Sequence, residues 1–270
     1  MPATLTDGID ETARTLLTDA GGSVLVVDPS ERAVEALVDV AVELDDPPTL
    51  QLLAEESSMK RVMEDFLVAS NAADLVEAGV LEIRTADVAP GNELLLTESR
   101  LAALVWANGT VAALTTEDAS FVSAANDGYG DAWADAEAFS LRTPPLSQVR
   151  ESLRSEIGDA TADDFDAVLE SLTTARGNGK GLDEVTISLL VAAKNEELLY
   201  DISKWGEDIG IASKATFSRT KTTLEDLGLI DTEKVPIDVG RPRLRLKFGH
   251  DKLSGAGSDE LASVAQGLMG

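Results

Sequence analysis

Apolar residues in the first half of the chain recur with strand and helix periods in turn. Short apolar runs predict strands at 23–28, 49–54, 81–84, 94–97, 102–107 and 110–114, and amphipathic stretches predict helices at 31–43, 56–69 and 118–139. Asn108-Gly109 is typical of a two-residue hairpin turn between the last two strands. Because the early strands alternate with helices, we predict a mixed α/β sheet that opens with parallel strands and ends in an antiparallel hairpin.

The second half of the chain has a different pattern, with helices first and strands last. Two helices are predicted at 147–156 and 162–174, then three more at 183–194, 198–209 and 213–227, followed by strands at 233–237 and 241–248. A tight turn at 210–212 joins the second and third of the three helices, which is the helix-turn-helix pattern. With the two strands as a wing, this segment is predicted to be a winged helix.

Four segments follow from these patterns. We expect an α/β domain at 1–145, closed by Thr143-Pro144-Pro145, and a helical linker at 146–181 whose glycine-rich stretch 177–181 is flexible. The winged helix should occupy 182–250, and a flexible tail with a short helix should occupy 251–270.

Charge separates the same segments. The chain has 49 acidic and 22 basic residues, a net charge of −27. Residues 1–179 hold 34 acids and 10 bases, a net of 10 − 34 = −24, whereas residues 180–249 hold 12 acids and 11 bases, a net of 11 − 12 = −1. Relief of negative charge in one segment of so acidic a chain indicates that this segment approaches an anion.

The overall acidity itself points to a salt-rich environment. At about 1 M salt the Debye length falls to about 3 Å, so the self-repulsion of such a chain is largely screened. An acidic protein from an ordinary environment, or a partly disordered chain, is the alternative, although the acids are spread among periodic apolar residues rather than gathered in blocks. We therefore expect a halophilic source.

The third helix of the predicted winged helix has two distinct faces. Phe217, Thr220, Leu224 and Leu227 fall on the side expected to pack inward. The opposite side carries small and hydroxyl residues that let a helix approach base edges, and an arginine that can contact guanine with two hydrogen bonds. No acid occurs between residues 213 and 224. The residues expected to contact DNA from this helix are Ser213, Lys214, Ala215, Thr216, Ser218, Arg219, Lys221 and Thr222, with Lys214 and Lys221 beside the phosphates.

The last predicted strand alternates basic and apolar residues. Arg241, Arg243, Arg245 and Lys247 share one face, which we expect to point outward toward DNA. Gly240-Arg241-Pro242 resembles the core of an AT-hook, which enters narrow minor grooves, although Val239 replaces the arginine that precedes that core. Two alternatives stay open: winged helices also serve as protein-docking modules, and charges can protect an edge strand from aggregation.

The chain resembles the haloarchaeal TbsP transcriptional regulators along nearly its whole length. The likeness is densest in residues 199–246, which read LYDISKWGEDIGIASKATFSRTKTTLEDLGLIDTEKVPIDVGRPRLRL. That family is associated with TrmB-type regulators of sugar metabolism, so the resemblance implies a DNA-binding repressor or activator of central carbon genes. Carried over to this sequence, it assigns recognition to residues 213–222 and the wing to Arg241 and Arg243.

The N-terminal domain is more loosely similar to the effector domain of TrmB-type proteins, a degenerate phospholipase D-like fold. The enzymes with that fold need a nucleophilic histidine near a lysine, and the sole histidine here, His250, lies beyond the wing. Phosphodiester hydrolysis by that mechanism is therefore excluded. The chain has no cysteine, and adjacent carboxylates carry no information in so acidic a sequence. We predict no catalytic residue, no metal site and no cofactor.

The remaining expectations concern partners. The leading hypothesis is a cytoplasmic homodimer that binds double-stranded DNA. Its α/β domain senses a small metabolite or mediates assembly, and its linker helices pair the two winged helices. The candidate effector site is a cleft at the carboxyl ends of the first strands, near Asp28, Pro29 and Ser30. The alternatives are an N-terminal interaction platform without a ligand, a winged helix that assembles with protein rather than DNA, and an enzyme tethered to DNA.

Overall fold

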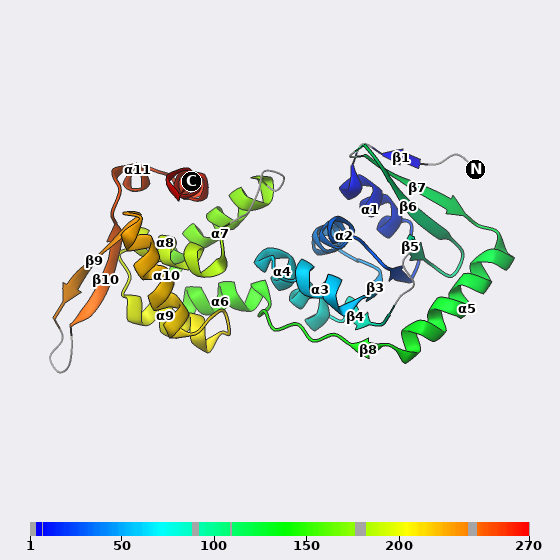
Figure 1. Cartoon of the computed structure of the whole chain (residues 1–270), viewed down its shortest axis with the longest axis horizontal. Coiled ribbons are helices and arrows are strands. Elements are labelled where there is room, and N and C mark those ends of the chain that lie inside the picture. The colour runs from blue at the N-terminus through cyan, green and yellow to red at the C-terminus, as the bar shows by residue number, and fades with distance from the viewer. Residues whose placement is uncertain are drawn as a thin grey trace. The chain divides into compact units, whose positions relative to one another are not determined.

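The computed structural model describes residues 4–6, 8–87, 92–108, 110–175, 182–236 and 242–269. The chain divides into two compact units, Met1–Pro145 and Leu146–Gly270, and each is described by itself (Figure 1). Gly109, the glycine-rich stretch 177–181 and Arg241 lie outside the described residues.

The first unit is built on one mixed sheet of eight strands in the order β1-β7-β6-β5-β2-β3-β4-β8. β2, β3 and β4 are parallel, and the remaining pairs are antiparallel, so the predicted mixed sheet is confirmed. The strands are β1 (Thr4–Thr6), β2 (Ser23–Val27), β3 (Thr49–Ala54), β4 (Leu81–Thr85), β5 (Glu93–Leu96), β6 (Leu101–Ala107), β7 (Thr110–Thr116) and β8 (Glu137–Ala138).

The two faces of this sheet are covered unequally. Four helices cover one face and build the larger core: α1 (Ile9–Thr18), α2 (Glu31–Glu43), α3 (Glu56–Val62) and α4 (Phe66–Glu77). On the other face, α5 (Ala119–Asp135) is the one helix among the described residues, over a smaller core that includes Val27, Leu53 and Leu96 (Figure 1). Within α5 only Val122 is buried. In the described part of the unit, Val105 of β6 and Leu114 of β7 stay exposed on this face.

Several elements differ from the sequence prediction. The single helix predicted at 56–69 is two helices, because Asp65 starts a new one by accepting a hydrogen bond from the Val68 amide at 3.0 Å. The strand predicted at 23–28 is β2, which ends one residue earlier, at Val27, because Asp28 adopts a positive φ of 49°. The sequence analysis missed α1, β1 and β8.

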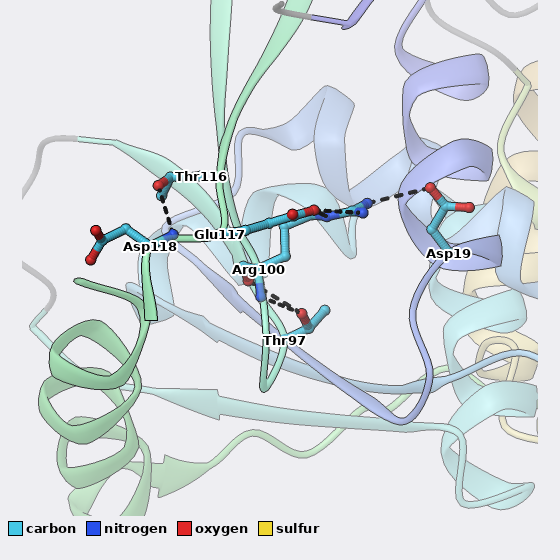
Figure 2. A network of polar contacts seen from close by, with 6 residues as sticks. All are labelled: Asp19, Thr97, Arg100, Thr116, Glu117 and Asp118. Carbon is cyan, nitrogen blue, oxygen red and sulfur yellow. Dashed lines mark hydrogen bonds and ion pairs between the residues drawn. The ribbon is translucent and has the colours of Figure 1, made fainter. Parts of the chain in front are cut away.

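A cluster around Arg100 ties the end of α1 to the end of β7. The guanidinium forms ion pairs with Asp19 at 3.3 Å and with Glu117 at 3.1 Å, as Figure 2 shows. The Arg100 amide donates to Thr97 Oγ1 at 3.0 Å, and the Asp118 amide donates to Thr116 Oγ1 at 3.2 Å (Figure 2). Because carboxylates from two elements hold this arginine, we assign the cluster a structural role.

The second unit contains seven helices and one hairpin among its described residues. The elements are α6 (Leu146–Glu156), α7 (Asp159–Ala175), α8 (Glu184–Lys194), α9 (Leu199–Asp208), α10 (Lys214–Asp226), β9 (Ile230–Val235), β10 (Arg243–Phe248), α11 (Asp251–Ser254) and α12 (Ser258–Met269). α8 lies at the centre, with every residue from 185 to 193 buried. The helices α8, α9 and α10 with the hairpin β9–β10 form the predicted winged helix.

Residues 251–270 contain a helix, as expected, but α12 is packed against the unit rather than part of a flexible tail. Leu261, Ala262 and Ala265 of α12 are buried, and α12 packs against α7. Asp164 of α7 accepts hydrogen bonds from Lys194 Nζ at 2.8 Å and from the Ser258 hydroxyl. The expected linker helices and the expected tail are therefore parts of one folded unit with the winged helix.

Asp164 also titrates at lower pH than an ordinary aspartate. Burial by itself raises the pKa of this carboxyl, but hydrogen bonds from Lys194, Ser258 and Asn195 outweigh burial and hold the pKa below its ordinary value. The charged form is therefore the one that joins α7, α8 and α12.

No helix in the described ranges is both long and apolar enough to cross a membrane. Among the same residues, no three potential ligands of the types His, Cys, Asp or Glu come together as a metal site.

Candidate nucleic-acid interface

The start of α10 is fixed by its cap and by the turn before it. Ser213 Oγ accepts a hydrogen bond from the Thr216 amide at 3.2 Å, as its position before the helix predicts. Gly210 has a φ of 88°, and the Ile211 amide returns to the Gly206 carbonyl at 2.8 Å. The turn uses a left-handed conformation that glycine adopts without strain, so the two helices meet at a defined angle.

Close contact between α9 and α10 depends on Gly206. A Cβ at Gly206 would lie 2.4 Å from the ring of Phe217, which is fully buried. Trp205 is also buried, and its indole nitrogen donates to Ser152 Oγ at 2.9 Å, which joins α9 to α6. The sequence analysis missed Gly206, although a glycine inside an amphipathic helix is a signal of close packing.

The outward face of α10 carries the residues expected to meet base edges. Ala215, Ser218, Arg219 and Thr222 are exposed. The Thr222 hydroxyl donates to the Ser218 carbonyl at 3.0 Å, whereas the Arg219 guanidinium makes no hydrogen bond or ion pair with any described residue. The Arg219 guanidinium is therefore accessible to a ligand, and the four residues of this face include no acid.

Lys214 lies at the edge of this face but is engaged by Glu207 of α9. The Lys214 ammonium is 2.5 Å from Glu207 Oε2, and the Lys214 amide donates to Glu207 Oε1 at 3.2 Å. The hydrogen bond from Lys214 lowers the pKa of Glu207, and the same bond raises the pKa of Lys214. To contact a phosphate, Lys214 has to exchange this carboxylate for it.

Lys221 does not lie where the sequence analysis expected it. Its side chain is 11% exposed and pairs with Glu225 Oε2 at 2.6 Å, so it points inward rather than toward phosphates. Glu225 also accepts from the Thr232 hydroxyl at 2.9 Å, which joins α10 to β9. The prediction that Leu227 packs inward is also wrong, because that side chain is 46% exposed.

The wing is a two-stranded hairpin with one further bridge to the segment before α9. β9 and β10 pair antiparallel from Ile230 opposite Phe248 to Val235 opposite Arg243. Leu198, just before α9, forms a further antiparallel bridge to Arg245, and the Leu246 amide donates to the Glu197 carbonyl at 2.8 Å. These two contacts join β10 to the segment just before α9.

The basic residues of β10 are mostly engaged within the unit. Arg243 donates to Asp201 Oδ1 at 3.2 Å and stacks over the Tyr200 ring, 4.4 Å from its centroid. Lys247 pairs with Glu233 at 2.5 Å, and this hydrogen bond raises the pKa of Lys247. Arg245 is half-buried and has no ion pair among the described residues. The sequence analysis missed Tyr200 and Asp201.

A groove of about 480 Å³ lies between α9, α10 and β10. It is lined by Tyr200 and Ser203 from α9, Lys214 and Ser218 from α10, and Arg243 of β10, together with Leu199, Pro242 and Leu244. Half of the Tyr200 side chain is exposed. Two cations, each paired with a carboxylate, two hydroxyls and an aromatic ring therefore surround one concave surface.

The expected effector residues also lie around a cleft, in the first unit. Asp28, Pro29 and Ser30 line a cleft of about 640 Å³ together with Arg32, Arg61, Asn92, Glu93 and Trp106, among others. Glu93 accepts from the Trp106 indole nitrogen at 2.9 Å and from Ser30 Oγ at 3.1 Å. Glu93 and Trp106 come from β5 and β6, whose contribution the strand-end argument did not predict.

The fold and the surface of the second unit define a winged helix-turn-helix protein of the DNA-binding class. Models of the TbsP-like transcriptional regulators match both halves: the N-terminal model matches residues 1–144 and the C-terminal helix-turn-helix model matches residues 145–266. The chain belongs to this family of transcriptional regulators, and its second unit is the helix-turn-helix domain of the family.

Other comparisons are distant. No curated protein matches the chain. Among solved structures, TrmBL2, described as an archaeal chromatin protein with a novel mode of DNA binding, is 14% identical over 52% of this chain and 54% of its own, with a TM-score of 0.36. Nuc from Salmonella typhimurium, a phospholipase D family member, is 10% identical over 48% of this chain and 89% of its own, also with a TM-score of 0.36. Neither likeness is close enough to transfer a function.

Proposed function

We propose that the chain reads specific double-stranded DNA sequences with α10 and regulates genes of central carbon and sugar metabolism. The outward face of α10 supports this proposal, because Arg219 is exposed and unengaged within the described residues on a surface free of acids. Inserted in a major groove, a guanidinium in this position can donate two hydrogen bonds to guanine, while Ala215 and Ser218 permit close approach. The metabolic targets come from the resemblance to sugar regulators.

Arg219 and the hydroxyls beside it are assigned to base reading, and Lys214, Arg243 and Arg245 to the backbone. Arg241, outside the described residues, is assigned to the minor groove beside the wing. In a salt-rich archaeal cytoplasm, counterion release contributes less to affinity, so base contacts carry more of it. Lys221 has no part in this interface, because Glu225 holds it inside the unit.

The regulator acts as a homodimer in this proposal. Two copies would place two recognition helices on half-sites one or more helical turns apart, so the operator would be palindromic. No catalysis is assigned to the chain.

DNA fragments selected from a random pool by the full chain in about 2 M KCl test the main proposal, since at this salt only base and shape contacts remain strong. We expect an enriched palindrome. Arg219→Ala should then weaken binding to it by about 1–3 kcal/mol and relax the choice at one base pair in each half-site. Arg142→Ala removes the same charge from an exposed position in the first unit and should change neither property.

Failure to enrich any sequence would overturn sequence-specific binding. Equal losses for Arg219→Ala on selected and random DNA would overturn base reading by α10 while leaving DNA binding in place.

The cleft around Asp28, Pro29 and Ser30 is proposed as the effector site. Its lining combines an indole, two arginines and the Glu93 carboxylate, a mixture that suits a small polar metabolite better than a bare anion. Titrating sugars and central metabolites into the full chain, with indole fluorescence as the readout, tests this site. A response that survives Trp106→Phe, with Trp133 and Trp205 intact, would place the ligand elsewhere. The absence of any response would favour an interaction platform instead.

A further inference from the structure

The incompletely covered face of the first unit's sheet carries exposed apolar side chains. Three of them are large: Val105 on β6 is 44% exposed, Leu114 on β7 is 49% exposed and Phe121 on α5 is 57% exposed. The register pairs Val105 with Ala112 and Ala103 with Leu114, so the two strands contribute neighbouring side chains to one surface. We call this surface the β6–β7 face: Ala103, Val105, Ala107, Thr110, Ala112, Leu114 and Thr116, with residues 119–126 of α5 beside them.

No charged residue belongs to the β6–β7 face. Its seven strand positions and the eight residues 119–126 are all apolar or neutral, although 49 + 22 = 71 of the 270 residues in the chain are charged. An exposed apolar surface without carboxylates, in a chain this acidic, is suited to a contact rather than to solvent. Carboxylates border the face, since Glu117 follows Thr116 and residues 119–126 lie between Asp118 and Asp127. The other large exposed apolar residues of the unit, Val42 on α2 and Val76 on α4, are on separate helices.

The contact available here is between side chains, not strand edges. β7 pairs with β6 on one side and with β1 on the other, from Thr4 opposite Ala113 to Thr6 opposite Val111. Because β7 has a neighbour on each side, a partner cannot extend the sheet at this point by adding a strand. It can only pack face to face.

Charge decides which partner fits. Nucleic acid and anionic lipid surfaces need cations, and the β6–β7 face has none. Two copies of a chain with a net charge of −27 repel each other wherever carboxylates meet, and least where both surfaces are neutral. A two-fold axis places the same patch of each copy against the other, so a neutral apolar patch is matched by itself.

We propose that the β6–β7 face is the surface through which two copies of this chain associate. The inference rests on the proposed function only in that it specifies the contact of the homodimer. Apolar association of this kind should strengthen as KCl is raised, because salt screens the surrounding carboxylates and salts out apolar surface. An interface held by ion pairs would weaken under the same change.

The test compares two double variants of the full chain by sedimentation equilibrium in about 2 M KCl, where the repulsion between copies is screened. Val105→Lys with Leu114→Lys places four ammonium groups in the proposed contact and should raise the dimer dissociation constant by at least about 100-fold. Val42→Lys with Val76→Lys introduces the same charge at equally exposed positions on α2 and α4 and should leave the dissociation constant unchanged.

A second measurement does not depend on how the lysine variants fold. The chain has no cysteine, so Val105→Cys and Val42→Cys each create a single labelling site. Maleimide labelling at position 105 should slow at least about tenfold as protein concentration passes the dissociation constant, because association covers the thiol. Labelling at position 42 should not change.

Three results would overturn the proposal. The wild-type chain could stay monomeric at high concentration, the double variant Val105→Lys with Leu114→Lys could still dimerise, or the labelling rate at position 105 could be independent of protein concentration. The same variants separate this inference from DNA reading. The lysine pair should yield a monomer that still binds a single half-site, whereas Arg219→Ala should yield a dimer that has lost sequence choice.

Discussion

The outward face of α10 and the basic face of β10 look alike in sequence but differ in what their cations contact. Arg219 on the helix is exposed and meets no carboxylate in the described part of the chain, whereas on the strand Arg243 meets Asp201 and Lys247 meets Glu233. The strand runs between β9 and the entrance of α9, which both supply acids, while α10 presents its outer side to solvent. A periodic pattern of basic residues therefore predicts which way a side chain points, but not whether a carboxylate of the protein already pairs with its charge.

The largest effect should come from disturbing the position of α10 as a whole. Gly206→Ala drives a methyl group into the Phe217 ring, and overpacking of this kind costs about 1–3 kcal/mol. We expect the unfolding free energy of the second unit to fall by this amount and specific DNA affinity to fall at least about tenfold, because a displaced helix loses several contacts together.

Urea unfolding and gel-shift titration measure these two quantities. Gly128→Ala on α5 is the matched control, since its new Cβ would meet nothing within 4 Å. It should leave DNA binding unchanged and stabilise the first unit slightly, as alanine does in helices. Normal DNA affinity in Gly206→Ala would contradict the importance of the α9–α10 contact.

A smaller effect, on stability alone, is expected at Lys221. Lys221→Met keeps most of the buried aliphatic chain but removes the partner of Glu225, so we expect a loss of about 1 kcal/mol in unfolding free energy. DNA affinity should be within error of wild type, in contrast to Arg219→Ala. A weaker salt dependence of DNA binding in Lys221→Met would show that this lysine contacts phosphate after all.

The smallest effect should be a gain in DNA affinity. Glu207→Gln removes the carboxylate that holds Lys214, so the ammonium becomes free for phosphate, and DNA affinity at low salt should rise by about threefold, as for exposed ion pairs. Glu233→Gln makes the equivalent change beside Lys247 on the strand. A gain from the first and none from the second would assign phosphate contact to the helix side, and both gains should vanish in molar KCl.

The sequence predicted best those elements whose ends are fixed by local chemistry. α2 and β3 have the predicted bounds, and Ser30 Oγ accepts from the Ala33 amide at 3.3 Å at the start of α2. Helical spacing also placed Ala215, Ser218, Arg219 and Thr222 correctly on the exposed side of α10, although it failed for Leu227. Elements without a strong period, such as the three-residue β1, were not predicted.

Two different causes account for what the sequence analysis missed at the interface: a local spacing that was misread at Lys221, and long-range contacts at Arg243. Lys221 lies one turn after Phe217 and almost one turn before Leu224, so its inward position follows from the same spacing, and only its charge suggested otherwise. Asp201 and Tyr200 reach Arg243 from more than forty positions away in the chain. No local pattern contains that pairing, since it depends on how the wing folds back on α9.

Glu197 has an unusual place in the second unit. Its carbonyl accepts the Leu246 amide of the wing, and its carboxylate accepts the Thr161 hydroxyl of α7 at 3.1 Å. A single residue thus connects α7 to the backbone of the wing through two hydrogen bonds. If Thr161→Val frees the Glu197 side chain, faster hydrogen exchange at the Leu246 amide would show that the order of the wing depends on a helix outside it.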